Sequence, residues 1–298
     1  MNPLLRRLVE GYEGLVGHLV GQPTAELTAL WLEVAKERAA GRTPAEVLRA
    51  FLRDGYVQPA PVDARALRRA ELASLDVAEA FEAIELSPLA PLGSCSTFSL
   101  GGQNRVFSAA RNLEVLADPT NVLALECARR RRAGQTGILD LCTVGRLVRC
   151  QPLKSEAHTR HFSMFAAVTA GRDKDARRFA LKTFTRHLTL QRDLHVRLAQ
   201  DRDAAAVRLE LFNTPPFQAV ANALHDQFKG TFPQIDRLPL EQAYYSGIRY
   251  RVWMRFGEET LPISDGGYFD WLQTLCSDRK EHFVASALGT ELVTRKQP

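Results

Sequence analysis

The sequence predicts an α+β fold that follows a helical N-terminal extension. Residues 1–58 carry apolar side chains at helical spacing, whereas residues 63–298 alternate short β-like runs with helices and lack a strict β-α-β repeat. Hydrophobic residues make up 45% of the chain and charged residues 24%, as in an ordinary globular protein. We therefore expect a helical extension over residues 1–58 and one α+β core over residues 63–298.

Three helices are predicted in the extension, and the third has the clearest start. Thr43-Pro44-Ala45-Glu46 has the pattern of a capping box with proline at the first helical position, and Gly55 follows the apolar face of this helix. The segment 55–62 then holds two prolines within a short span, which favours a linker. We place the boundary between extension and core in this segment.

Strands in the core are predicted at residues 106–109, 139–148, 162–169 and 248–254, and helices at residues 63–81, 121–132 and 185–212. His187 and His195 fall in the last of these helices, where we expect them on a charged surface. The basic run Arg129 to Arg132 ends the helix before it. A solvated helix C-terminus explains this run better than contact with nucleic acid.

Charge and cysteine content limit the partners and the compartment. The formal charge of +5 is compatible with an anionic partner such as a nucleotide or RNA, but an excess this small supports RNA binding only weakly. No stretch approaches the roughly 20 apolar residues of a membrane-spanning helix. The 5 cysteines show no C-x-x-C spacing, which favours buried thiols over a disulfide framework or a zinc site. We expect a cytoplasmic protein with no metal site and no membrane contact.

Three segments in the last fifth of the chain carry the most specific pattern. They run from Tyr244 to Tyr250, from Asp265 to Asp270 and from Ala287 to Glu291. Their order resembles histidyl-tRNA synthetase, a class II aminoacyl-tRNA synthetase, in which a Tyr-Tyr-Thr-Gly strand, a Gly-Gly-Arg-Tyr-Asp turn and a Gly-Leu-Glu-Arg junction follow one another. The resemblance implies a class II synthetase-like core, an antiparallel sheet flanked by helices.

The same resemblance implies ligand-binding roles for two tyrosines and three glycines of these segments. The residues are Tyr244, Tyr245, Gly247, Gly266 and Gly267. The residues themselves leave another interpretation open, in which the tyrosines are ordinary strand aromatics and the glycines form turns or a bulge. The two interpretations are compatible if the glycines let a ligand approach the backbone closely.

A second block, from Val148 to Phe165, is similar to the class II hairpin that embraces ATP. An arginine inside an apolar strand is costly unless it faces a groove or a partner, so Arg149 is the first candidate for a ligand contact, with an internal salt bridge as the alternative. The resemblance implies that Arg149 grips the α-phosphate, that Phe165 stacks under adenine and that Arg160 assists. ATP and Mg²⁺ are the cofactors that it implies.

Two carboxylates are candidates for holding an amino group or a metal ion. Asp118 lies where the family places its Arg-Pro-Glu-x-Thr segment, and Glu291 lies in the C-terminal junction. Each is also explained as a helix cap. The strand near Pro88 lies where the dimerisation motif of the family ends, so the resemblance implies a homodimer.

Several family positions lack the charge that adenylation normally requires. Leu292 stands where the family has an arginine for the γ-phosphate, although Arg295 lies near the same helical face and is a candidate substitute. Residues 240–243 replace an Arg-Gly-Leu-Asp segment, and Gln151 replaces a glutamate. Each change removes charge that would pair with ATP or an amino acid. No anticodon-binding domain is expected after residue 298.

These departures favour a catalytically degenerate paralogue over an active enzyme. It would bind a small ligand, an amino acid or a nucleotide, in the former active-site cleft. Its role would be regulatory, and it could have a protein partner. In this it would be similar to the synthetase-like regulatory subunit of ATP phosphoribosyltransferase. The alternative is an ATP-dependent ligase that forms an acyl-adenylate, with Arg295 replacing the missing arginine and Mg²⁺ held through Glu291. An RNA-binding accessory protein is the weaker third hypothesis.

Overall fold

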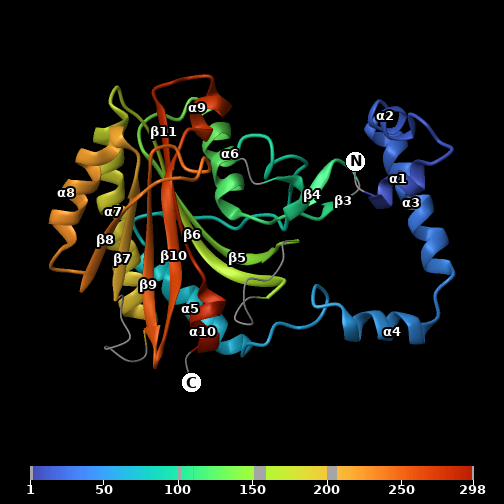
Figure 1. Cartoon of the computed structure of the whole chain (residues 1–298), viewed down its shortest axis with the longest axis horizontal. Coiled ribbons are helices and arrows are strands. Elements are labelled where there is room, and N and C mark those ends of the chain that lie inside the picture. Colours follow the sequence, from blue (N-terminus) through green and yellow to red (C-terminus); the bar gives the residue numbers. More distant parts are fainter. Residues whose placement is uncertain (1–2, 100–101, 110, 151–158, 200–206, 297–298) are drawn as a thin grey trace.

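The computed structural model describes residues 3–99, 102–109, 111–150, 159–199 and 207–296. Figure 1 shows a twisted sheet with helices on both faces and a separate helical arm at the N-terminal end. Gln151 and the loop of residues 152–158 lie outside the described residues.

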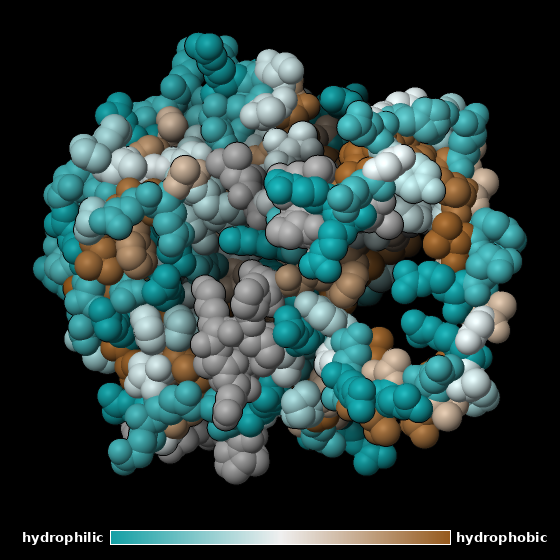
Figure 2. Space-filling model, turned by 45° about the vertical axis from the view of Figure 1, so that its right-hand side comes forward, coloured by the Kyte–Doolittle hydropathy of each residue, from teal (hydrophilic) through white to brown (hydrophobic). Residues whose placement is uncertain are grey.

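The arm consists of α1 (Pro3–Val9), α2 (Leu15–Val20), α3 (Thr24–Ala40) and α4 (Pro44–Arg53). The predicted capping box is confirmed, because the Thr43 hydroxyl accepts the Glu46 N–H at 3.3 Å and the Glu46 carboxylate accepts the Thr43 N–H at 2.8 Å. Within the described residues of α2, α3 and α4 no side chain is buried. Apolar side chains are therefore exposed along the arm, on the right-hand side of Figure 2.

The linker after α4, residues 55–62, contacts the core. The Arg160 guanidinium donates to the Tyr56 hydroxyl at 3.2 Å and lies 5.0 Å from the centre of its ring. The Tyr56 ring meets Phe107 edge-on at 4.8 Å, and farther along the arm Asn112 donates to the Thr24 hydroxyl at 2.6 Å.

The main sheet has the strand order β1-β5-β6-β11-β10-β9-β7-β8. Its strands are β1 (Glu82–Ala83), β5 (Leu139–Val148), β6 (His161–Arg172), β7 (Arg208–Asn213), β8 (Gln234–Pro239), β9 (Ile248–Phe256), β10 (Glu259–Phe269) and β11 (Glu281–Leu288). The central pairings from β5 to β7 are antiparallel, and the edge strands β1 and β8 pair in parallel with their neighbours. A small sheet of β2 (Leu89–Pro91), β4 (Leu113–Val115) and β3 (Ser108–Ala109) lies beside it.

Two sets of helices cover the two faces of the main sheet. The first face packs on α6 (Pro119–Arg132) and α9 (Trp271–Cys276). The second packs on α5 (Ala64–Val77), α7 (Ala176–Leu198), α8 (Gln218–Phe228) and α10 (Thr290–Lys296). Side chains alternate between faces along each strand, so that Ala166 and Val168 of β6 contact the first set while Phe165 and Ala167 contact the second. The predicted sheet flanked by helices is thus confirmed.

The helix predicted over residues 185–212 is partly wrong. The helix α7 ends at Leu198, and residues 208–213 form the strand β7 between β8 and β9. Leu209 and Leu211 are fully buried at strand spacing. A short apolar run such as this one is compatible with a helix or a strand. Pairing with β8 and β9 makes residues 208–213 a strand.

The prediction that His187 and His195 lie on the surface of α7 is also wrong. His187 contacts the Thr169 hydroxyl at 2.9 Å and the Ser286 hydroxyl at 2.8 Å, and His195 contacts the Ser264 hydroxyl at 2.7 Å. Both side chains are fully buried against the sheet. Burial lowers the pKa of His187 to about 3, with a smaller contribution from Arg186, and lowers the pKa of His195 to about 4.

No helix in the described part of the chain combines the length and apolarity needed to cross a bilayer.

Candidate functional site

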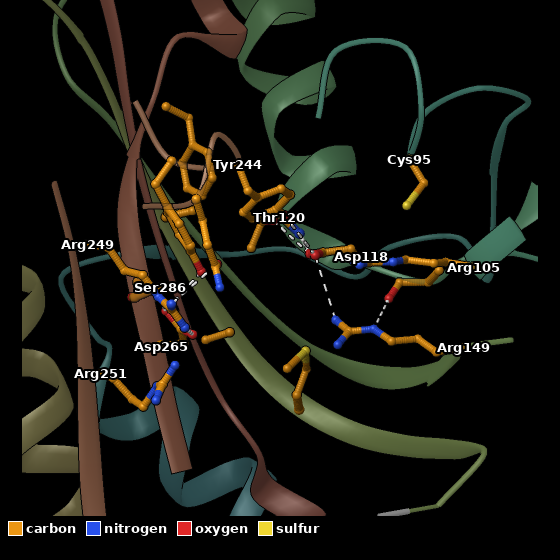
Figure 3. A pocket seen from close by; sticks show the side chains of 18 of the residues that line it. Cys95, Arg105, Asp118, Thr120, Arg149, Tyr244, Arg249, Arg251, Asp265 and Ser286 are labelled. Atoms are coloured by element: carbon orange, nitrogen blue, oxygen red, sulfur yellow. Dashed lines mark hydrogen bonds and ion pairs between the residues drawn. The ribbon is translucent and has the colours of Figure 1, made fainter. Parts of the chain in front are cut away.

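A cleft of about 620 Å³ opens on the sheet face that carries α6 and α9. Its floor comes from β6, β10 and β11, and its walls from β9, the segment 242–245, the start of α6 and the segment that carries Cys95 and Arg105. Figure 3 shows two charged groups at opposite ends of this cleft, one around Asp118 and one around Asp265. Four arginines and two aspartates line it.

Asp118 organises one end of the cleft. Its Oδ1 caps α6 by accepting the Thr120 N–H at 3.0 Å and the Thr120 hydroxyl at 2.7 Å. Its Oδ2 lies 3.5 Å from the Tyr244 hydroxyl and 3.7 Å from Nη2 of Arg149. The second distance exceeds that of a hydrogen bond and the first is at its limit. The outer oxygen of Asp118 is therefore loosely held and faces the cleft.

Arg149 is fixed by contacts that leave part of its guanidinium for other partners. Its Nε donates to the Ala117 carbonyl at 2.8 Å, and its guanidinium carbon lies 5.2 Å from the centre of the Phe162 ring. The side chain is 28% exposed and lines the cleft. Arg149 thus faces the cleft and also pairs weakly with Asp118.

Asp265 forms a tighter group at the other end. Arg249 donates to both of its oxygens, with Nε 2.9 Å from Oδ1, and the Tyr245 hydroxyl donates to the same Oδ1 at 2.9 Å. The Arg249 guanidinium also lies 4.8 Å from the centre of the Tyr245 ring. Arg251 beside it pairs with Glu210 at 3.3 Å. These charges are satisfied within the protein.

The two tyrosines lie against each other edge-on at 4.9 Å and line the cleft. Burial raises the pKa of both hydroxyls well above the ordinary value, reinforced by Asp118 for Tyr244 and by Asp265 for Tyr245. Both hydroxyls therefore remain protonated at neutral pH and act as hydrogen-bond donors.

The paired glycines of β10 make room for aromatic rings. A Cβ on Gly267 would lie 2.2 Å from a ring carbon of Tyr245, and a Cβ on Gly266 would lie 2.5 Å from the Tyr250 ring on the opposite face. Gly266 also lines the cleft. Gly247 has a different role, because its φ of +114° and a Cβ position 2.3 Å from the Phe217 ring require glycine in a turn outside the cleft.

The loop between β2 and β3 brings Cys95 and Arg105 to the Asp118 end. The buried Glu114 carboxylate holds this loop, since it accepts the N–H groups of Gly93 and Cys95 at 2.9 Å each and the Gln103 side chain at 3.0 Å. Burial, with Asp118 and Glu114, raises the pKa of the Cys95 thiol to about 11. The Cys95 thiol therefore lines the cleft in its protonated form at neutral pH.

The predicted ligand residues divide into two groups. Five of them line the cleft together, namely Asp118, Arg149, Tyr244, Tyr245 and Gly266, and Gly267 supports the Tyr245 ring. The structure places the remaining ones elsewhere. Phe165 is fully buried on the opposite face, because the alternation of β6 directs Met164 into the cleft instead. Arg160 contacts the linker at Tyr56.

Glu291 and Arg295 belong to α10, on the sheet face opposite the cleft. Glu291 is buried, pairs with Arg146 at 2.9 Å and accepts the Ser163 N–H at 3.2 Å. Leu292 is half-buried and packs against the core of that face. None of these side chains is among those that line the cleft in the described part of the chain.

Three functional candidates escaped the sequence analysis, namely Arg105, Arg249 and Asp265. Arg249 and Asp265 lie within two of the segments that carry the family resemblance. On the neighbouring strands β9 and β10, Asp265 is directly opposite Arg251 and is a diagonal neighbour of Arg249. That complementarity was a usable signal. Arg105 had none, because only the folded loop brings it to the cleft.

Comparison with solved structures supports the fold. A histidine–tRNA ligase subunit from Alicyclobacillus acidocaldarius is similar with a TM-score of 0.61 and 14% identity, over 86% of this chain and 96% of that chain. An ATP phosphoribosyltransferase regulatory subunit/histidyl-tRNA synthetase from Bacillus halodurans gives 0.60 and 10%, over 80% and 82%. The apo histidyl-tRNA synthetase of S. aureus gives 0.57 and 11%, over 81% and 68%.

No protein-family model matches the sequence, and no curated protein matches it either. At these identities the similar structures establish the class II aminoacyl-tRNA synthetase-like fold and not a shared activity.

Proposed function

We propose that this chain is a catalytically degenerate class II synthetase-like protein that binds a small ligand, an amino acid in the first place, at the Asp118 end of the cleft. The observation that carries the proposal is the loose pair of Asp118 and Arg149, with 3.7 Å between the nearest charged atoms and the Tyr244 hydroxyl close by.

A zwitterionic ligand suits such a pair. Its ammonium group can take the outer oxygen of Asp118, and its carboxylate can take the part of the Arg149 guanidinium that Ala117 does not use. Each new contact would be a charge-assisted hydrogen bond, which is stronger than a neutral one. The weak internal pair is given up at little cost because both side chains are partly exposed.

A triphosphate nucleotide fits the described side chains less well. Of the residues proposed for ATP and Mg²⁺, Arg149 lines the cleft, whereas Phe165, Arg160, Glu291 and Arg295 do not. Leu292 packs into the core of the opposite face, and no arginine of α10 takes its place in the cleft. The residue set thus supports ligand binding without adenylation. Homodimer formation and a protein partner stay predictions.

Calorimetric titration with each of the 20 common amino acids, and separately with ATP and Mg²⁺, tests the proposal. Asp118→Asn and Arg149→Ala are the informative variants. Asparagine caps helices as well as aspartate does, so the first variant removes charge and keeps the start of α6. Arg172→Ala is a matched control, because Arg172 is an ion-paired arginine at the end of β6 that does not line the cleft.

At least one amino acid should bind the unaltered protein. Each cleft variant should weaken that binding by about 10-fold to 100-fold, the effect of losing a hydrogen bond to a charged group. The control should leave it unchanged. Binding of no amino acid, or binding that neither cleft variant affects, would refute the proposal.

A further inference from the structure

The charged side chains that line the Asp118 end of the cleft are two arginines and one carboxylate. Arg105 and Arg149 line it together with a single carboxylate, Asp118, and Figure 3 shows both arginines extending toward that carboxylate from different elements. Glu114 lies behind the loop, and its oxygens are taken by two backbone N–H groups and by Gln103. An amino acid with a neutral side chain would use Asp118 and Arg149 and would leave the Arg105 guanidinium without an ion-pair partner.

Arg105 is the arginine that accounts for this excess. Its side chain is exposed at the cleft rim, and within the described residues it has no ion-pair or hydrogen-bond partner. Its backbone is nonetheless fixed, because its carbonyl accepts the Cys150 N–H at 2.9 Å and the preceding Gln103 is held by Glu114 at 3.0 Å. The other cleft arginines, in contrast, have carboxylate partners.

We propose that the cleft selects a ligand with a net negative charge, whose anionic group beyond the α-carboxylate binds Arg105. The inference rests on the proposed function and specifies its ligand class. With Asp118 on the ammonium group and Arg149 on the α-carboxylate, Arg105 is the remaining cation at this end. A guanidinium binds a planar carboxylate or a phosphate in the same forked geometry, so both chemistries qualify.

Three matched ligand pairs test the charge rule by calorimetry. They are glutamate against glutamine, aspartate against asparagine, and phosphoserine against serine. The protein variants are Arg105→Ala and Arg105→Lys, and Arg279→Ala is the control because Arg279 is exposed and does not line the cleft. The readout is the affinity ratio within a pair, which general damage to the cleft would not change selectively.

The anionic member of at least one pair should bind about 10-fold more tightly than its neutral partner, the size expected for one added charged hydrogen bond. Arg105→Ala should bring that ratio close to one by weakening only the anionic member. Arg105→Lys should keep part of the ratio, and Arg279→Ala all of it. A preference confined to phosphoserine identifies the group as phosphate, and one confined to glutamate or aspartate identifies it as carboxylate.

Equal binding within every pair would overturn this inference and leave the proposed function standing. A preference that survives Arg105→Ala would also overturn it, because another residue would then recognise the charge. Failure of all six compounds and of the remaining amino acids to bind would refute the inference and the proposed function together.

Discussion

The N-terminal arm and the core contain helices of similar length, but these helices differ in what they contact. The helix α4 of the arm has a complete capping box and no buried residue, whereas α8 of the core has no side-chain cap and buries Val220, Ala221, Leu224 and Phe228. The arm helix α4 therefore relies on its local capping signal, whereas burial stabilises the core helix α8. Isolated helices of this length are marginal in water.

Exposed apolar side chains in the arm show the same contrast. They include Trp31, Val47, Leu48, Phe51 and Leu52, each more than two-fifths exposed. The arm thus depends on capping and on its few contacts with the core, while the core holds the sheet and the cleft. The comparison teaches that amphipathic periodicity predicts a helix without predicting its packing partner.

Matched leucine truncations should give the largest difference. Leu224→Ala in α8 removes a fully buried side chain and should lower the free energy of unfolding by about 2–5 kcal/mol. Leu48→Ala in α4 removes a side chain that is 58% exposed and should change it by less than about 0.5 kcal/mol. Urea unfolding followed by circular dichroism measures both. Equal losses would mean that Leu48 is buried in solution.

The buried histidines predict a pH dependence that belongs to the core. Because the folded-state pKa values of His187 and His195 are about 3 and about 4, the unfolded chain binds more protons than the folded one below pH 6.5. Stability is therefore fully present above that pH and is lost as the pH falls toward the folded values, by up to about 1.4 kcal/mol per pH unit for each histidine.

Urea unfolding at pH 7, 6 and 5 checks this dependence. His18→Gln in the arm, where the histidine is exposed, should leave the slope unchanged. A stability that stays constant or rises from pH 7 to pH 5 would contradict the burial of the two histidines.

A methyl group at Gly267 should act on the cleft as well as on stability. Gly267→Ala forces a Cβ against the Tyr245 ring and should cost about 1–3 kcal/mol through overpacking. It should also weaken ligand binding, because the ring moves toward the cleft. In the arm, Gly41→Ala meets its nearest atom at 3.8 Å with a φ of −77°, so it should be neutral. Thermal unfolding and calorimetric titration compare the two, and equal effects would refute the close contact.

The smallest effect is expected from the helix cap of the arm. Thr43→Ala removes the capping box and should destabilise α4 by about 1 kcal/mol. Hydrogen exchange of the α4 amides should therefore accelerate by roughly fivefold, while the unfolding of the core stays unchanged. Acceleration of core amides such as those of β6 would show that arm and core unfold as one unit.

Features encoded by local pattern could be predicted from the sequence. The strand β5 has the predicted bounds, because most of its 10 residues are apolar and a turn precedes it. The capping box needs only four consecutive residues. Asp118, Arg149, Tyr244 and Tyr245 could be gathered because ordered motifs place their segments around one cleft.

Features that depend on register or on long-range packing could not be predicted. A shift of one residue separates Met164 in the cleft from Phe165 in the opposite core, and the sequence does not fix which face of β6 is which. The position of Arg105 depends on Glu114, which holds its loop from a different strand. The burial of His187 and His195 depends on hydroxyl partners far away in the sequence.

Amino-acid-dependent exchange of pyrophosphate into ATP tests the central claim most directly, because exchange requires an aminoacyl-adenylate, which the proposed degenerate cleft should not form. We predict no exchange above the protein-free background with Mg²⁺ and any of the 20 common amino acids, in a sample that binds an amino acid by calorimetry. Exchange that depends on Arg149 would contradict the account and make the protein an adenylate-forming ligase.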